Sequence, residues 1–301
     1  MIVACGPRPP LDAIIDELHV RGPIALVTAG WQEREDEPAD VGDVPAVRLA
    51  LHARTDQVFA DDPELAAAYK LRQLKLKSLQ DFYRVRLDHA AQAARTIALR
   101  TANTELHAEE HAASLALIRS IDNDHLERCR AVHAAFDAQI VERDVLAKHV
   151  RELRDAIAPT AALAIAGGHV AVLLNRLRLF DMVALAGDRP IIAWSAGAMA
   201  LSDRVVLFHD DPPHGDAISE ILDAGLGVAR DMVLLPDASE RLHLHDRERV
   251  GELAQRYAPA PCYALDPGAQ LWLDRGRVTR AIAVRQLALS GEVEDVTART
   301  P

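Results

Sequence analysis

The sequence predicts a doubly wound α/β protein with a mostly parallel sheet and a long all-helical insertion. Short apolar runs, each followed by a glycine, a small residue or a polar turn, alternate with helical segments in both flanks of the chain. The chain has 301 residues, half of them apolar, which suffices for two domains or for one domain with a large insertion. We therefore expect an α/β domain formed by residues 1–60 and 158–301, and a helical insertion over residues 61–157.

The flanks contain the predicted strands and the helices between them. Strands that alternate with helices are typical of an open parallel sheet, and ligands of such sheets bind beyond the carboxyl ends of the strands. The predicted strands are Ile24–Thr28, Leu163–Ala166, Ile191–Trp194, Val233–Leu235, Cys262–Leu265, Leu271–Leu273 and Arg277–Val284, with a closing hairpin expected at the end. The predicted helices between them are Val170–Leu179, Ala198–Leu201 and Arg247–Tyr257.

The insertion is predicted to contain two or three long antiparallel helices. No glycine occurs between Gly42 and Gly167, while Ala, Leu, Arg, Glu and Gln, which favour helices, are abundant there. Residues 101–104 and 122–124 are rich in capping side chains, so we expect the helices to break at these two places.

The first predicted helix of the insertion has both a start signal and an apolar stripe. Asp61 and Asp62 precede Pro63, which is the pattern of an N-cap followed by a first-turn proline. A helical hairpin cannot bury both of its faces by itself, so we expect it to pack on the α/β domain or on its copy in a second subunit, which predicts a homo-oligomer. The apolar stripe comprises Leu71, Leu74, Ser78, Leu79, Phe82 and Leu87.

Composition and charge argue against several classes of protein. The net charge of −11 at pH 7 argues against nucleic acid or an anionic membrane as partner, so the basic stretch from Lys70 to Arg86 is read as a solvated helix face. No apolar run reaches the ~18 residues of a membrane span, and the first residues lack the pattern of a signal peptide. The cysteines (Cys5, Cys129 and Cys262) are too few and scattered for a disulfide framework, so we expect a cytoplasmic protein.

Residues 191–199, IIAWSAGAM, have the layout of a nucleophile elbow. An apolar strand leads into Ser195, and small residues and a helix-compatible segment follow at once. A sharp strand-to-helix turn brings backbones close together, so its neighbours must be small, as Ala196 and Gly197 are. The residue two before the serine is Ala193, where the usual pattern has glycine. A tight turn with an incidental serine is the alternative interpretation.

A second turn of the same kind precedes the elbow. Residues 163–175 read as an apolar strand, the pair Gly167 and Gly168, and a helix. Paired glycines after a strand let backbone N–H groups face a substrate oxyanion, and the N–H groups of Gly168 and Ala196 are the candidate donors. A plain strand–helix turn explains the same residues without any function.

The two turns together resemble the peptidase E and cyanophycinase family, which are serine hydrolases. The resemblance covers residues 160–275 and, more weakly, residues 20–35. It implies a flavodoxin-like fold similar to that of class I glutamine amidotransferases, so residues 1–60 and 158–301 become a hydrolase-like domain. It also implies a Ser–His dyad with an acidic partner, which cuts peptide bonds next to acidic residues. By this resemblance Ser195 is the nucleophile, Gly168 and Ala196 are the oxyanion donors, and Asp210 is the acidic residue.

The sequence departs from the family at the histidine. Relatives of peptidase E carry it in an N-P-H type motif after a strand, and Asp237 occupies that position here. A carboxylate is a weak base toward a serine hydroxyl. The histidines that could replace it are His169, His209, His214, His243 and His245, of which His243, near Asp210, is our candidate base.

Two functions are therefore left open by the sequence. The first is a peptidase E-like hydrolase that acts on a small peptide or amide through Ser195, with His243 as base. The second is a catalytically impaired family member, with Asp237 in the histidine position, that serves as a binding or oligomeric scaffold through its helical arm.

No cofactor and no metal ion is predicted. The chain has neither a P-loop nor a dinucleotide-binding glycine motif. His107 and His111 are four residues apart, but Ala108 stands where a zinc protease motif needs glutamate. The acidic segment from His209 to Asp216 matches no known spacing of metal ligands and is more simply a solvated turn.

Overall fold

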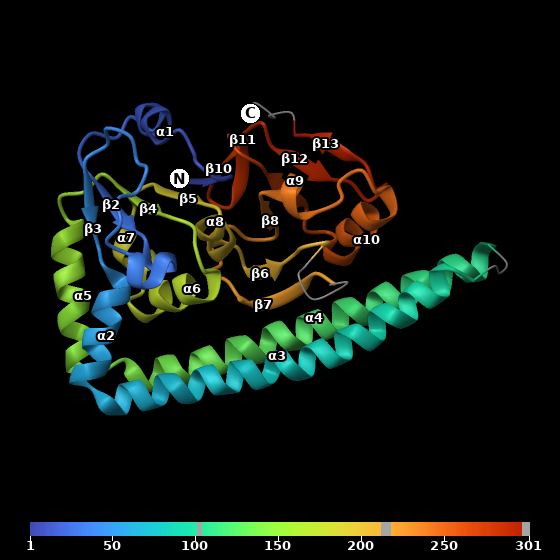
Figure 1. Cartoon of the computed structure of the whole chain (residues 1–301), viewed down its shortest axis with the longest axis horizontal. Helices are drawn as coiled ribbons and strands as arrows, with labels where there is room; N and C mark the ends of the chain where they lie inside the picture. Colours follow the sequence, from blue (N-terminus) through green and yellow to red (C-terminus); the bar gives the residue numbers. More distant parts are fainter. Residues whose placement is uncertain (101–103, 212–217, 297–301) are drawn as a thin grey trace.

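The computed structural model describes residues 1–100, 104–211 and 218–296, and it shows a mixed α/β molecule with long helices (Figure 1). The central sheet has seven strands in the order β11-β10-β1-β5-β4-β2-β3. The strands from β1 to β3 in this order are mutually parallel, and β10 and β11 are antiparallel additions, so the predicted, mostly parallel sheet is confirmed. Its strands are β1 (Ile2–Cys5), β2 (Ile24–Val27), β3 (Ala46–Arg48), β4 (Ala162–Ile165), β5 (Ile191–Trp194), β10 (Gln270–Asp274) and β11 (Arg277–Ile282).

Three neighbouring strands of this sheet are buried along their whole length. Every residue of β2, β4 and β5 is buried, which is why they read as continuous apolar runs. Successive side chains of a strand point to opposite faces. Ala25 and Val27 accordingly belong to one hydrophobic cluster, and Ile24 and Leu26 belong to another. The first cluster is completed by α6 (Val170–Leu179), α7 (Met182–Ala186) and α8 (Ala196–Leu201), and the second by α1 (Leu11–Glu17).

Two of the predicted strands lie outside the central sheet. They are β8 (Val233–Pro236) and β9 (Cys262–Leu265), which pair in parallel within a separate four-stranded sheet of order β13-β12-β9-β8. The predicted closing hairpin is confirmed as the antiparallel pair of β10 and β11. The sequence did not predict β1, β3, β6, β7, β12 and β13, and none of these six strands is buried along its whole length. The remaining elements are η1 (Ala29–Arg34), β6 (Arg204–Leu207), β7 (Glu220–Ala224), α9 (Ala238–Arg241), α10 (Arg247–Tyr257), β12 (Arg285–Leu287) and β13 (Val293–Asp295).

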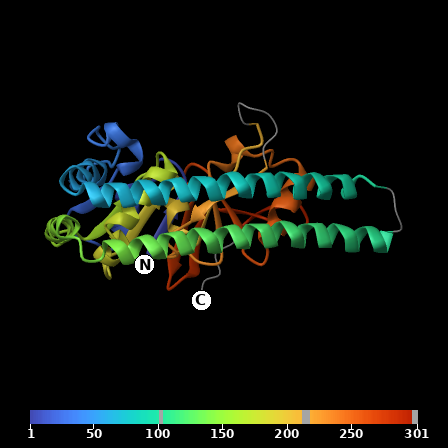
Figure 2. The same cartoon turned by 90° about the horizontal axis from the view of Figure 1, so that it is seen from below.

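The middle of the chain forms helices, as predicted, and two of them are very long. Figure 2 shows α3 and α4 side by side along one side of the molecule, and we call this pair the α3–α4 hairpin. The predicted break at residues 122–124 is wrong because α4 runs through it, whereas residues 101–103 lie outside the described part of the chain. Within that described part, no helix has both the length and the apolar character needed to cross a membrane. The four helices of this region are α2 (Leu51–Asp61), α3 (Pro63–Ala98), α4 (Thr104–Ile140) and α5 (Asp144–Ile157).

The start of α3 agrees with its sequence signal, but its apolar stripe does not. The Asp62 carboxylate accepts a hydrogen bond of 2.9 Å from the N–H of Leu65, as the predicted N-cap requires. In contrast, Leu71, Leu74 and Phe82 are 53%, 53% and 66% exposed, whereas Leu87 of the same stripe is buried. Most of the stripe therefore lies away from the face by which α3 packs on the rest of the molecule.

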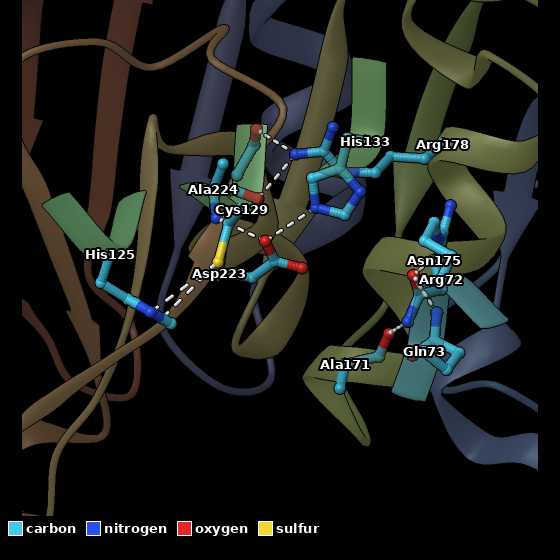
Figure 3. Close-up of polar contacts among 11 residues, drawn as sticks. Arg72, Gln73, His125, Cys129, His133, Ala171, Asn175, Arg178, Asp223 and Ala224 are labelled. Carbon is cyan, nitrogen blue, oxygen red and sulfur yellow. Dashed lines mark hydrogen bonds and ion pairs between the residues drawn. The ribbon is translucent and has the colours of Figure 1, made fainter. Parts of the chain in front are cut away.

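Buried polar pairs hold the α3–α4 hairpin against the α/β part of the molecule (Figure 3). His133 of α4 has its Nε2 atom 2.7 Å from Asp223 Oδ1 of β7, and both residues are buried. Arg72 of α3 donates a hydrogen bond to Asn175 Oδ1 of α6. The bond to Asn175 allows α3 to bury an arginine on the face that packs against the α/β part.

A second buried network joins both helices of the hairpin to α10. The guanidinium of Arg256 donates to both carboxylate oxygens of Asp122, at 2.7 and 2.6 Å. Tyr83 donates its hydroxyl to Asp122 at 2.7 Å and accepts the backbone N–H of Ile221 at 3.0 Å. Arg256, Asp122 and Tyr83 are 6%, 3% and 0% exposed, so each charge and each donor is satisfied inside the protein.

Candidate functional site

Ser195 lies in a tight turn between β5 and α8, as the sequence predicted. Its backbone has φ 52° and ψ −124°, a conformation that side-chain-bearing residues rarely adopt. Its N–H donates a hydrogen bond of 3.2 Å to the carbonyl of Cys5, at the end of the neighbouring strand β1. The residue is partly exposed at the carboxyl end of the parallel sheet. A strained residue held at such an edge is a candidate functional residue.

Glycines make room for this turn. A Cβ atom on Gly197 would lie 2.4 Å from the carbonyl oxygen of Ile165, so α8 can start this close to β4 only with glycine there. A Cβ atom on Gly167 would lie 2.8 Å from Cβ of Ser195. The small residues on which the elbow prediction rested are therefore required by contacts to the adjacent strand end.

The second predicted turn adjoins the first. Gly168 has φ 113°, and a Cβ atom on it would lie 2.5 Å from the carbonyl carbon of Gly30. The N–H of His169 donates a hydrogen bond of 2.7 Å to the Gly30 carbonyl, and this bond fixes the crossing of the two chain segments. The N–H groups of Gly168 and Ala196 donate no hydrogen bond to any described residue. Both predicted oxyanion donors are therefore unpaired, and Gly168 is exposed.

Asp237 follows β8 at the same edge of the molecule. It has a left-handed backbone, with φ 63° and ψ 37°, and its N–H donates 2.9 Å to the carbonyl of Leu265. That carbonyl lies 2.7 Å from the position of a Cβ atom on Gly6, the residue after Cys5. The contacts of Cys5 and Gly6 thus connect the turn of Ser195 to the strand ends next to Asp237.

The candidate base is paired elsewhere. His243 has its Nε2 atom 2.6 Å from Asp211 Oδ2, and its backbone N–H donates 2.6 Å to Asp210 Oδ2. Arg249 donates to the other oxygen of Asp210 at 2.9 Å. The structure brings Asp210 and His243 together, as the prediction requires, but Ser195 Oγ forms no hydrogen bond with either, or with any other described residue.

Asp210 and His243 line a cavity of about 380 Å³ between the α3–α4 hairpin and α10. The walls combine apolar side chains with nearly as many polar and charged ones, and Ser195 is not among the lining residues. Glu252 also lines this cavity, and burial raises the pKa of its carboxyl group, with the nearby Glu248 as a further cause. The predicted base and acid thus belong to a cavity that Ser195 does not line.

The other histidines that could replace the expected one have local roles or lie outside the description. His169 accepts the N–H of Val172 at 3.4 Å and caps α6. His209 accepts the N–H of Asp211 at 3.1 Å. His214 lies outside the described residues. His245 is exposed, with its ring 5.7 Å from that of His243.

Neither metal ligands nor a cysteine nucleophile is assembled here. Across residues 1–100, 104–211 and 218–296, no cluster of three or more His, Cys, Asp or Glu side chains is arranged to hold a metal ion. Cys5 is next to the turn of Ser195, and burial raises the pKa of its thiol to about 12. A thiol that stays protonated at neutral pH is a poor nucleophile.

The sequence did not single out Gly30 or Gly6, although both shape the site. Each follows a buried strand, and each carries a backbone crossing that a side chain would block. A glycine directly after an apolar run was the available signal. The strand before Gly6, β1, was not among the predicted strands.

No family model matches the chain, and no curated protein matches it. The functional assignment therefore depends on the geometry around Ser195.

Proposed function

We propose that this protein is a serine hydrolase of the peptidase E type that acts on a small peptide or amide. In this proposal the α/β part has the flavodoxin-like, glutamine amidotransferase-like fold, and the α3–α4 hairpin belongs to an insertion in it. The observation that carries the proposal is the backbone of Ser195, whose positive φ at a strand-to-helix turn is typical of an activated nucleophile.

The chemistry follows from the groups at this turn. Ser195 Oγ attacks the carbonyl carbon of the substrate while a base takes the hydroxyl proton. The negative charge that develops on the carbonyl oxygen is stabilised by the free N–H groups of Gly168 and Ala196. His243 is the proposed base, and Asp210 holds its segment through the backbone hydrogen bond. Because the His243 ring pairs with Asp211 in this structure, this step requires the ring to leave Asp211 and reach Ser195 Oγ. The base then returns the proton to the leaving amine, and water releases the acyl group.

A second candidate function is favoured by the absence of an imidazole bonded to Ser195 Oγ among the described residues. Asp237 stands where the family carries histidine, and its carboxylate is a weak base. In this case the elbow binds a carbonyl-containing ligand without cleaving it. The two candidates differ only in whether Ser195 can be activated.

Fluorophosphonate labelling separates the two candidates. We expect wild-type protein to be labelled on Ser195 and the Ser195→Ala variant to remain unlabelled. His243→Ala should slow labelling by at least ~100-fold, because general-base catalysis contributes about that much. Turnover is checked with the same variants by measuring the free aspartate that is released from a dipeptide with N-terminal aspartate.

The Asp237→His variant tests the second candidate directly. Histidine tolerates a left-handed backbone better than most residues, so it fits this position. If the protein is an impaired relative, wild type stays unlabelled while Asp237→His gains labelling on Ser195, and the Asp237→Asn control does not. If neither wild type nor Asp237→His reacts, and both are folded by circular dichroism, the elbow is not a nucleophile and both forms of the proposal are wrong.

A further inference from the structure

The side of the α3–α4 hairpin turned away from the α/β part exposes large apolar side chains. We call it the outer face and define it by Leu71, Leu74, Phe82 and Val85 of α3 and Leu117 of α4, which are 53%, 53%, 66%, 57% and 53% exposed. At about 100° of rotation per residue, the four α3 residues lie within about 80° of one another and on the side away from the buried side chain of Tyr83. The stripe spans about 20 Å of helix. A monomer has no evident use for such a stripe.

The outer face also has hollows between its two helices. One cavity of about 210 Å³ is lined by Leu71 of α3 and by Ala131 and Ala135 of α4, among others. A second cavity, of about 560 Å³, lies farther along the hairpin, between His89 of α3 and Leu106 of α4. Apolar side chains that protrude from α3 and a hollow lined by two α4 alanines are the two complementary parts of a helix–helix interface.

The two helices carry opposite charge. Along its length, α3 has seven basic and three acidic residues, whereas α4 has seven acidic and three basic residues. Three of these, Arg72, Arg84 and Asp122, are paired on the inward side, and the remaining charges still leave α3 net positive and α4 net negative. In the middle of the outer face, Asp124 is neutralised by Arg86 at 2.7 Å and by Arg128 at 3.5 Å. An occupant that offers the opposite pattern, negative over α3 and positive over α4, would match the face.

We propose that the outer face binds the outer face of a second copy of this chain, with α3 of each copy against α4 of the other. A two-fold axis parallel to the helices produces this arrangement and forms a four-helix bundle. It places the basic helix of one copy on the acidic helix of the other. A two-fold axis across the helices would instead place α3 on α3 and α4 on α4, so that like charges would repel each other. Leu71 lines the same hollow as Ala131 and Ala135 within one chain, so the parallel axis brings Leu71 of one copy to this hollow in the other.

The shape of the molecule permits this dimer. The hairpin runs along one side of the α/β part in Figure 1 and lies in front of it when seen from below in Figure 2, so the two α/β parts lie on the outside of the bundle. The turn of Ser195 is in the α/β part, and the interface does not depend on whether that residue is a nucleophile.

The mass in solution tests the interface. By light scattering after size-exclusion chromatography we expect wild type to have twice the chain mass of 32.9 kDa. The double variant Leu71→Glu/Phe82→Glu should lower the association constant at least ~100-fold, because it buries charge in the core of an interface. The control Leu289→Glu changes a residue that is 57% exposed on the α/β part and should remain dimeric. A monomeric wild type, or a double variant that is folded and still dimeric, overturns the proposal.

Disulfide cross-linking tests the orientation. Leu71→Cys protein mixed with Ala135→Cys protein should give a cross-linked heterodimer under mild oxidation, and either variant alone should not. All three natural cysteines are buried, so they do not compete. Cross-links that form only between two copies of one variant contradict the α3-on-α4 arrangement.

Salt dependence tests the charge argument. Raising the salt concentration from about 0.05 to about 0.5 M shortens the Debye length to a few Å and screens surface charges. The dimer should therefore weaken at high salt, and a dimer strengthened by salt contradicts the charge argument.

Discussion

At the scale of single residues, the site depends on where side chains are absent. Ser195 keeps a positive φ because β5 and α8 are packed on both sides of it, and the close approaches of Gly167 and Gly197 leave the turn no room to relax. The strain is therefore maintained by the surrounding packing, as expected where a side chain has to be presented at a fixed angle. Cys5, directly beside the turn, contributes only its carbonyl oxygen.

Two helical glycines provide a matched test of this argument. Gly197→Ala should lower the free energy of unfolding by about 1–3 kcal/mol, because its Cβ atom would lie 2.4 Å from a carbonyl oxygen. Gly251→Ala, in α10, meets nothing closer than 3.4 Å and should be neutral or stabilising by up to about 1 kcal/mol. Urea denaturation of the two variants measures both effects, and equal loss in both would mean that the contact at Gly197 is not limiting.

At the scale of elements, α3 shows that an apolar stripe need not be the packed face. Its inward side meets polar groups of the α/β part, so Arg72 and Tyr83 are buried there by pairing, while Leu71 and Phe82 stay outside. Burying a charge is tolerated when a partner of opposite charge and further hydrogen bonds are buried with it. Arg256 of α10 is the partner of opposite charge for Asp122 of α4, and it also donates a hydrogen bond to the hydroxyl of Tyr83 of α3.

The network around Arg256 should therefore be sensitive to the loss of any partner. Asp122→Ala leaves a buried guanidinium without its carboxylate and should cost about 3–5 kcal/mol of unfolding free energy. Tyr83→Phe removes the acceptor of the Ile221 N–H and should cost about 1–3 kcal/mol. Arg86→Ala breaks only the exposed pair with Asp124 and should cost less than about 1 kcal/mol. Thermal or urea denaturation gives this order, and a different order would mean that the network is not the main link.

At the scale of the whole molecule, the hairpin and the α/β part are joined by buried contacts at several separate places. His133 with Asp223, Arg72 with Asn175 and Arg256 with Asp122 connect them at different points along α3 and α4. The paired residues are 90, 103 and 134 positions apart in the chain. If one part separated from the other, the buried polar groups of each part would lose their partners. The two parts should therefore unfold as one unit.

This cooperativity can be measured with two signals that report on different parts. All three tryptophans, Trp31, Trp194 and Trp272, lie in the α/β part, whereas much of the helical circular dichroism comes from α3 and α4. In wild type, tryptophan fluorescence and the 222 nm signal should change at the same urea concentration. In Asp122→Ala the two transitions should separate. Separate transitions in wild type would show that the hairpin is an independent unit.

The candidate site divides in the same way between local and long-range causes. The turn at Ser195, the glycine pair and the N-cap Asp62 were predicted from neighbouring residues, because backbone sterics and capping act over a few positions. The partner of His243 was not predicted. Its imidazole pairs with Asp211, and the sequence alone gives no reason to choose Asp211 over Ser195 as that partner. The roles assigned to Ser195 and His243 stay predictions until they are tested.

The sequence by itself determined the alternation of strands and helices, the mostly parallel sheet and the small residues around the turn, since periodicity and steric size are properties of short segments. Only the tertiary structure decided that β8 and β9 leave the central sheet, and that α3 turns Arg72 inward and Leu71 outward. Those choices depend on which polar groups of distant segments meet in space. A buried charge requires a partner, and that partner is known only once the chain has folded.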